Sequence, residues 1–125
     1  FPVGEIRGQI GVIVRTVSLS GSQESPPNSS TATGAGVLFV NPVTRGITGT
    51  LTITGMTVTA AHIHEGPVGV VSPVIVPLTA GAAGVFTVPA GTTLTASQFA
   101  SLLAGQLYFN AHSAAFPVGE IRGQI

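Results

Sequence analysis

Apolar and polar residues alternate with a period of two along much of this 125-residue chain. The clearest case is residues 47–54, ITGTLTIT, where Ile47, Leu51 and Ile53 share one face and threonines occupy the other. Successive side chains of a β-strand point to opposite faces, so this pattern predicts a strand of an antiparallel sheet with one buried face. The alternation therefore favours an all-β fold.

The same pattern predicts seven further strands, which are separated by turns rich in Gly, Pro and Asn. In residues 11–21, Val12, Val14 and Thr16 alternate with Ile13, Arg15 and Val17, and the pattern leaves open which set is buried. Residues 22–30 contain two adjacent prolines and are expected to form a turn or loop. The further strands are expected at about residues 11–21, 33–40, 57–64, 74–78, 84–88, 106–112 and 119–125.

One short helix is expected near residues 95–104. Thr95 and Gln98 have the spacing of a capping box, Phe99 and Leu102 begin an apolar stripe, and Gly105 stands where a helix commonly ends. A helix of about two turns needs tertiary packing to be stable, so we expect it to close one end of the fold. Eight short strands and one helix predict a single antiparallel β-sandwich or flattened barrel with Greek-key-like connections.

A decapeptide occurs twice: residues 1–10 and 116–125 are both FPVGEIRGQI, at an offset of 115 residues. This repetition indicates a repeat unit spanning residues 11–125, with residues 1–10 as the closing strand of a preceding unit. No Pro or polar spacer separates Ile10 from Gly11, so a stiff strand of on the order of 65 Å is expected to cross the joint. The predicted assembly-strand residues are Phe1, Val3, Glu5, Ile6, Arg7 and Ile10, with Phe116, Val118, Glu120, Ile121, Arg122 and Ile125 in the second copy.

Two other interpretations of the decapeptide remain open. One copy of the segment can instead add a strand to a neighbouring molecule, as in donor-strand assembly. The duplication can also be engineered, or reflect a window cut from a longer periodic chain. Each interpretation implies a unit of 115 residues.

The charge content limits the partners of the chain. Only 6% of the residues are charged, four Arg and four Glu, and the net charge is zero. Nucleic acids are excluded as partners because no excess of cations is present to release counterions. No apolar run reaches the roughly 20 residues of a membrane helix, so no membrane insertion is expected. Low charge also weakens repulsion between copies, which favours self-association into a homopolymer or tandem array.

Three histidines form the sharpest candidate for chemistry. His62 and His64 lie two apart on one predicted strand face, and His112 lies on another strand. Neutral imidazoles bind copper or zinc, so His62, His64 and His112 are candidate metal ligands. The alternative is that they hydrogen-bond to the backbone, Glu65 or Glu120. The chain has no Cys and no Asp, which excludes a thiolate site and a Ser-His-Asp triad, and no enzyme is predicted.

Four motifs appear together along the chain: SLSGSQESPP at residues 18–27, AAHIHEGP at 60–67, LYFNAH at 107–112 and GEIRGQI at 119–125. As a set they resemble the CHRD, or chordin-type, domain over nearly all of residues 16–125. The resemblance implies an extracellular β-sandwich module that often occurs in tandem in secreted proteins and has no established enzymatic activity. Residues 62–66 also resemble the His-x-His-Glu strand of copper-zinc superoxide dismutases, which would imply a redox metal.

These observations predict a secreted structural repeat module that assembles end to end into a fibre, sheath or stalk through the duplicated strand. Two alternatives accompany this prediction. One is a histidine-rich domain that binds copper or zinc, with redox activity as one form of it. The other is a secreted ligand-binding module, for which the sequence names no pocket.

Overall fold

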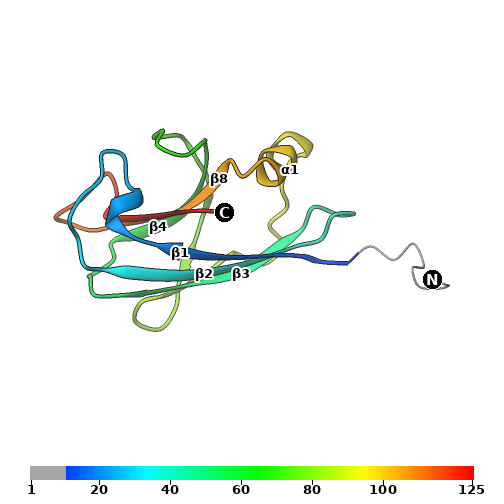
Figure 1. The fold of residues 1–125 in the computed structure, drawn as a ribbon. Coiled ribbons are helices and arrows are strands. Elements are labelled where there is room, and N and C mark those ends of the chain that lie inside the picture. Colours follow the sequence, from blue (N-terminus) through cyan, green and yellow to red (C-terminus); the bar gives the residue numbers. More distant parts are fainter. Residues whose placement is uncertain (1–10) are drawn as a thin grey trace.

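The computed structural model describes residues 11–125, which form two antiparallel sheets packed face to face (Figure 1). The five-stranded sheet has the order β1-β2-β3-β7-β6 and the four-stranded sheet has the order β5-β4-β8-β9. The predicted β-sandwich is therefore confirmed, and the alternative of a closed barrel is not adopted. The strands are β1 (Ile13–Leu19), β2 (Thr33–Val40), β3 (Ile47–Thr54), β4 (Ala60–Glu65), β5 (Val74–Pro77), β6 (Thr79–Ala80), β7 (Val85–Thr87), β8 (Leu107–His112) and β9 (Ile121–Gln124).

The strands β2 and β3 have the bounds predicted from the sequence, while the other predicted strands are shorter at one or both ends. The open question about β1 is settled by burial: Val17 and Leu19 are buried, whereas Val14 and Thr16 are exposed. Two elements were not predicted. The two-residue strand β6 is too short for a periodic signal, and residues Gly21–Gln23 form a 3₁₀ helix, η1, at the start of the predicted loop.

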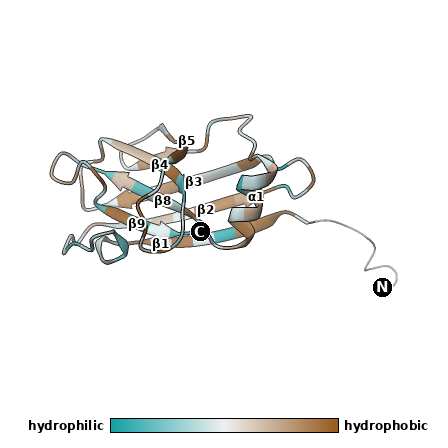
Figure 2. Ribbon diagram, turned by 90° about the horizontal axis from the view of Figure 1, so that it is seen from above, coloured by the Kyte–Doolittle hydropathy of each residue, from teal (hydrophilic) through white to brown (hydrophobic). Residues whose placement is uncertain are grey.

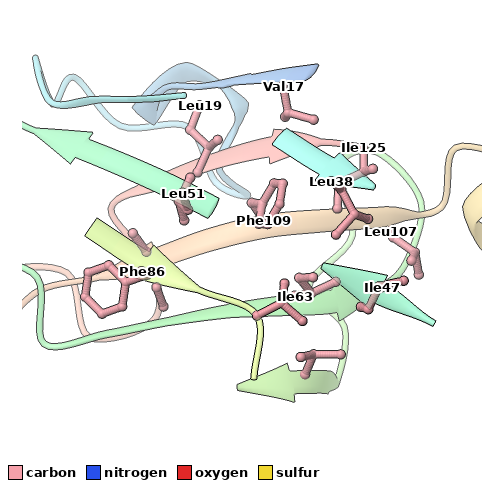
Figure 3. Packing of buried hydrophobic residues seen from close by; sticks show 14 of the residues in the cluster. Val17, Leu19, Leu38, Ile47, Leu51, Ile63, Phe86, Leu107, Phe109 and Ile125 are labelled. Atoms are coloured by element: carbon pink, nitrogen blue, oxygen red, sulfur yellow. The ribbon is translucent and has the colours of Figure 1, made fainter. Parts of the chain in front are cut away.

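The core lies between the two sheets (Figure 3). Leu38 and Leu51 of the five-stranded sheet and Ile63 and Phe109 of the four-stranded sheet are almost completely buried. Phe109 packs directly against the backbone of Gly36, where a Cβ atom would come within 2.7 Å of the aromatic ring. A glycine is needed at this position because the ring of one sheet occupies the space of a side chain on the other.

The predicted helix is present as α1 (Ala96–Leu103) and lies at one end of the two sheets (Figure 2). The hydroxyl of Thr95 accepts a hydrogen bond from the backbone N–H of Gln98, and the Gln98 side chain accepts one from the N–H of Thr95. This capping box satisfies two N–H groups that the first turn leaves free. Leu102 is fully buried, so the helix is held by core packing, as expected for so short a segment.

The closing strand β9 runs along β1 and joins the two sheets at one side of the sandwich. Ser20 and Arg122 exchange two backbone hydrogen bonds of 3.1 Å in antiparallel register. Gly123 lies so close to β1 that a Cβ atom would approach the Ser18 carbonyl oxygen to 2.5 Å. Because β9 is antiparallel to β1, it ends pointing toward the end of the sandwich at which β1 begins (Figures 1 and 2). The last residue, Ile125, lies about midway along the sandwich, where its N–H donates a hydrogen bond of 2.8 Å to the Leu107 carbonyl oxygen (Figure 1).

Candidate functional site

The outer face of the four-stranded sheet carries an unusual group of buried polar side chains. Alternate residues of β4, β8 and β9 point away from the core, and the loops at residues 20–30 and 66–73 lie over them through hydrogen bonds. Burial of polar groups without hydrogen bonds is costly, so this face must be densely hydrogen-bonded. Its buried members are Glu24, His64, Tyr108, Asn110, Ser113, Glu120 and Arg122.

The three histidines converge on this face. His62 and His64 come from β4, and His112 comes from the neighbouring strand β8, in which Asn110 lies opposite His62. One ring nitrogen of each histidine lies within 4.8 Å of those of the other two. His64 is buried, while His62 and His112 are half-buried. The histidine cluster thus has one inner member and two that reach solvent.

Two of the histidines are oriented by backbone carbonyl groups. His64 Nδ1 lies 2.8 Å from the Ser72 carbonyl oxygen, and His112 Nδ1 lies 3.0 Å from that of Pro117. A carbonyl oxygen only accepts hydrogen bonds, so both Nδ1 atoms carry the proton and the lone pair of each neutral ring is on Nε2. His112 Nε2 lies 3.1 Å from Nδ1 of His62 and accepts its hydrogen bond, whereas the buried Nε2 of His64 has no partner within residues 11–125.

The environment favours the neutral form of the two histidines on β4. Burial lowers the pKa of His64, and the nearby rings and Arg122 lower it further, while the bond to Ser72 acts in the opposite direction. Burial also lowers the pKa of His62, with a further contribution from His112. Both rings are therefore neutral at pH 7 and can offer lone pairs.

The alternative to metal binding was that the histidines hydrogen-bond to the backbone, Glu65 or Glu120, and the structure agrees with the backbone part of it. His64 and His112 bind backbone carbonyls, but neither Glu65 nor Glu120 is their partner. Glu65 accepts a hydrogen bond of 2.7 Å from Ser101 of α1, and Glu120 accepts one of 2.6 Å from Ser113. These bonds leave Nε2 of His64 unused.

An aromatic and cationic stack lies beside the histidine cluster. The rings of His64 and Tyr108 are parallel within 5°, and their centroids are 4.8 Å apart. The guanidinium carbon of Arg122 lies over the Tyr108 ring, 3.4 Å from its centroid. The Tyr108 hydroxyl also accepts a hydrogen bond of 3.0 Å from the backbone of Ser72. The stack fixes the plane of His64 and ties it to the closing strand.

Arg122 is held by carbonyl oxygens of the loop at residues 66–73. Its guanidinium donates hydrogen bonds of 2.8 Å to both Val70 and Pro67, and one of 3.2 Å to the Gln124 side chain. Glu120, two residues before Arg122, instead accepts hydrogen bonds from Ser30 and Ser113. The two charges of the closing strand therefore anchor two different segments and do not pair with each other. Glu5 and Arg7, their counterparts in the first copy of the decapeptide, lie outside the described residues.

Glu24 and Asn110 form a contact that the sequence analysis did not identify. Asn110 donates through Nδ2 to the Glu24 carboxylate and to the Ile121 carbonyl oxygen. Burial raises the pKa of Glu24 above 4.5, against the lowering effects of the Asn110 bond and the Arg122 charge. The sequence offers one signal of this contact, an Asn on the face of β8 that also carries His112. The pairing itself could not be predicted, because the two partners are 86 residues apart in the sequence.

The second copy of the decapeptide is part of this unit. Glu120, Ile121, Arg122 and Ile125 are buried, Phe116 is half-buried, and Val118 is 74% exposed. The predicted strand at 119–125 begins two residues later, at Ile121, because Gly119 has a positive φ of 130° that places residues 117–119 in a turn. Residues Phe1, Val3, Glu5, Ile6, Arg7 and Ile10 of the first copy lie outside the described part of the chain.

These features define a β-sandwich module whose last strand closes the sheet over a polar outer face. The family model of the CHRD domain matches residues 15–125, and the chain belongs to this family, as the four motifs predicted. CHRD domains are typically found in secreted proteins. Searches of curated proteins and of solved structures gave no match. Within residues 11–125, no helix is both long and apolar enough to cross a membrane.

Proposed function

We propose that this chain is a structural repeat of an extracellular array, in which the closing strand of one unit leads directly into β1 of the next. The observation that carries the proposal is the identity of residues 1–10 with residues 116–125, the segment that provides β9 of the described unit. The first copy contains every side chain that anchors β9, including the counterparts of Glu120 and Arg122. It therefore has the composition needed to close a preceding sandwich.

The direction of β9 constrains the shape of such an array. A joint that continues from β9 into the next β1 places the entry end of one unit against the entry end of the next, because β9 runs toward the end of the sandwich at which β1 begins. Successive units then lie alternately on two sides of the joints. The proposed array is accordingly a double row, with two units per axial repeat, instead of a straight stack.

The outer face of the five-stranded sheet suits lateral contact between units. It is uncharged, with threonines on β3 and with Val12, Val14 and Phe39 exposed by 57%, 52% and 41%. Without repulsion between like charges, such faces can approach each other closely. The extracellular location follows from the family and is part of the proposal.

A chain of residues 1–125 followed by a second copy of residues 11–125 tests the joint. We expect small-angle X-ray scattering to give one elongated particle with the two entry ends facing each other, and longer arrays to form double-row filaments in electron micrographs. Two units that tumble independently would refute the rigid joint. A 125-residue chain that stays a monodisperse monomer at high concentration, together with long arrays that never assemble, would refute the structural function.

The donor-strand alternative is separated by removing residues 1–10. If assembly of the 125-residue chain depends on strand exchange between molecules, residues 11–125 alone stay monomeric while the full chain polymerises. If the array is covalent, removing residues 1–10 leaves the number of chains per particle in solution unchanged. Light scattering over a range of concentrations distinguishes these two outcomes.

A further inference from the structure

We propose that His62, His64 and His112 form a binding site for one late first-row divalent transition-metal ion, with Cu²⁺ bound more tightly than Zn²⁺. This inference is independent of the proposed array. It rests on the spacing of the ring nitrogens, on the hydrogen bonds that fix two of the rings, and on the unpartnered Nε2 of a buried histidine.

The spacing fits a small coordination sphere. Two nitrogens bound tetrahedrally to Zn²⁺ at 2.0–2.1 Å are about 3.3 Å apart. His62 Nδ1 and His112 Nε2 are already separated by 3.1 Å. The widest separation in the cluster is 4.8 Å, so closure requires a ring shift of about 1.5 Å. His62 and His112 are half-buried, whereas His64 is buried, so we expect the two outer rings to make this shift.

The hydrogen bonds prepare two of the ligands. Metal-bound histidines usually donate their other ring N–H to a carbonyl or carboxylate, which fixes the ring and its tautomer. Ser72 and Pro117 provide these carbonyls for His64 and His112, leaving both Nε2 atoms free to bind. His62 becomes the third ligand when the proton on its Nδ1, now directed at His112, moves to Nε2, which frees the Nδ1 lone pair and keeps the ring neutral.

The unpartnered atom is the strongest sign of a missing ligand. His64 is only 6% exposed, and its Nε2 has no hydrogen-bond partner within residues 11–125. A buried polar atom without a partner costs roughly 1–3 kcal/mol, so such atoms are rare in native proteins. A metal ion bound to this lone pair removes the cost.

The ligand chemistry selects the ion. Three neutral imidazoles suit Cu²⁺, Ni²⁺ or Zn²⁺, and Cu²⁺ stands highest in the affinity order, whereas Ca²⁺ and Mg²⁺ require oxygen ligands. The guanidinium group of Arg122 is stacked on the ring of Tyr108. Half-exposure of His62 and His112 leaves a side open to water, which can occupy the fourth position of the metal.

Isothermal titration calorimetry of the untagged 125-residue protein with Cu²⁺ and with Zn²⁺ tests the site. We expect about one ion per chain, and at least a 100-fold loss of affinity in His62→Ala and in His112→Ala. Glu65→Gln is the matched control: it lies on the same strand, retains an acceptor for Ser101, and is expected to bind as the native protein does. Circular dichroism of each apo variant establishes that it is folded.

The electron paramagnetic resonance spectrum of the Cu²⁺ protein provides a second measurement, in which imidazole ligands give nitrogen hyperfine structure. This spectrum distinguishes nitrogen ligation at the histidine cluster from copper bound by carboxylate oxygens alone. Less than about one tenth of an ion per chain after loading would overturn the proposal, given the affinities typical of protein metal sites. Binding that is unchanged in folded His62→Ala and His112→Ala proteins would overturn it as well.

Discussion

Replacing Arg122 with lysine tests whether the closing strand is held in place by the fork of a guanidinium group. Arg122 spans two carbonyl oxygens, those of Pro67 and Val70, with hydrogen bonds of 2.8 Å each, and its plane lies on the ring of Tyr108. Lysine keeps the charge, but its ammonium group is a single point without the flat face. The substitution therefore removes the planar, two-pronged donor group and keeps the positive charge.

The expected loss follows from these contacts. One of the two charge-assisted hydrogen bonds is lost, which is worth about 1.5–3 kcal/mol. The stacking on Tyr108 is also weakened, and a desolvated contact of this kind contributes up to about 2 kcal/mol. We expect Arg122→Lys to lower the free energy of unfolding by about 3 kcal/mol, which is a large share of the typical stability of a domain.

Equilibrium unfolding in guanidinium chloride measures this loss, and hydrogen exchange of residues 66–73 locates it. The matched control is Arg15→Lys, because Nε of Arg15 has no hydrogen-bond partner within residues 11–125, and we expect a change below about 1 kcal/mol there. Equal effects of the two substitutions, or unchanged exchange of residues 66–73 in Arg122→Lys, would refute the role assigned to the fork.

Two further predictions concern the core and the buried carboxyl group. Gly36→Val is expected to destabilise the protein by at least about 1–3 kcal/mol, because the new side chain overlaps the Phe109 ring. Ala35→Val, on the exposed face of β2, is the control and should be nearly neutral. Chemical unfolding compares the two variants, and equal losses of stability would contradict the packing of Phe109 against Gly36. Glu24 has a folded-state pKa raised above 4.5, so native protein binds a proton that unfolded protein has lost, and stability should fall as pH rises from 4.5 through the folded pKa. Glu24→Gln keeps an acceptor for Asn110, so its stability should not fall over this pH range. Urea unfolding midpoints measured at successive pH values test this expectation. If the variant has the pH profile of the native protein, a group other than Glu24 causes the fall in stability.

The sandwich was predictable because its strands bury one face and expose the other. Residues 47–54 show this directly: Ile47, Leu51 and Ile53 are buried, while Thr48, Thr52 and Thr54 are exposed. The same rule also brought the histidines together, since an i, i+2 pair on one strand shares a face with alternate residues of its neighbour. Convergence of His62, His64 and His112 thus required only that β4 and β8 be adjacent.

The polar interior of the outer face was not predictable by that rule. Alternation assigns Tyr108, Asn110 and Arg122 to the side opposite the core, which in a two-layer sandwich ordinarily faces solvent. They are buried because loops distant in the sequence lie over them: Arg122 binds Val70, which is 52 residues away. Loop conformation depends on such contacts and leaves no periodic signal. The same limitation hid the Glu24 contact.

The duplicated segment connects the proposed array with the proposed metal site. Pro117 belongs to the second copy, and its carbonyl oxygen accepts the Nδ1 hydrogen bond that directs Nε2 of His112 toward the cluster. A unit closed by its own segment therefore carries an oriented His112, and a unit without that segment does not. Because the first copy has Pro2 in the equivalent position, it is equipped by sequence to provide the same carbonyl to a preceding unit. Metal affinity should accordingly depend on strand closure, so that each closed joint of the array is accompanied by one competent site.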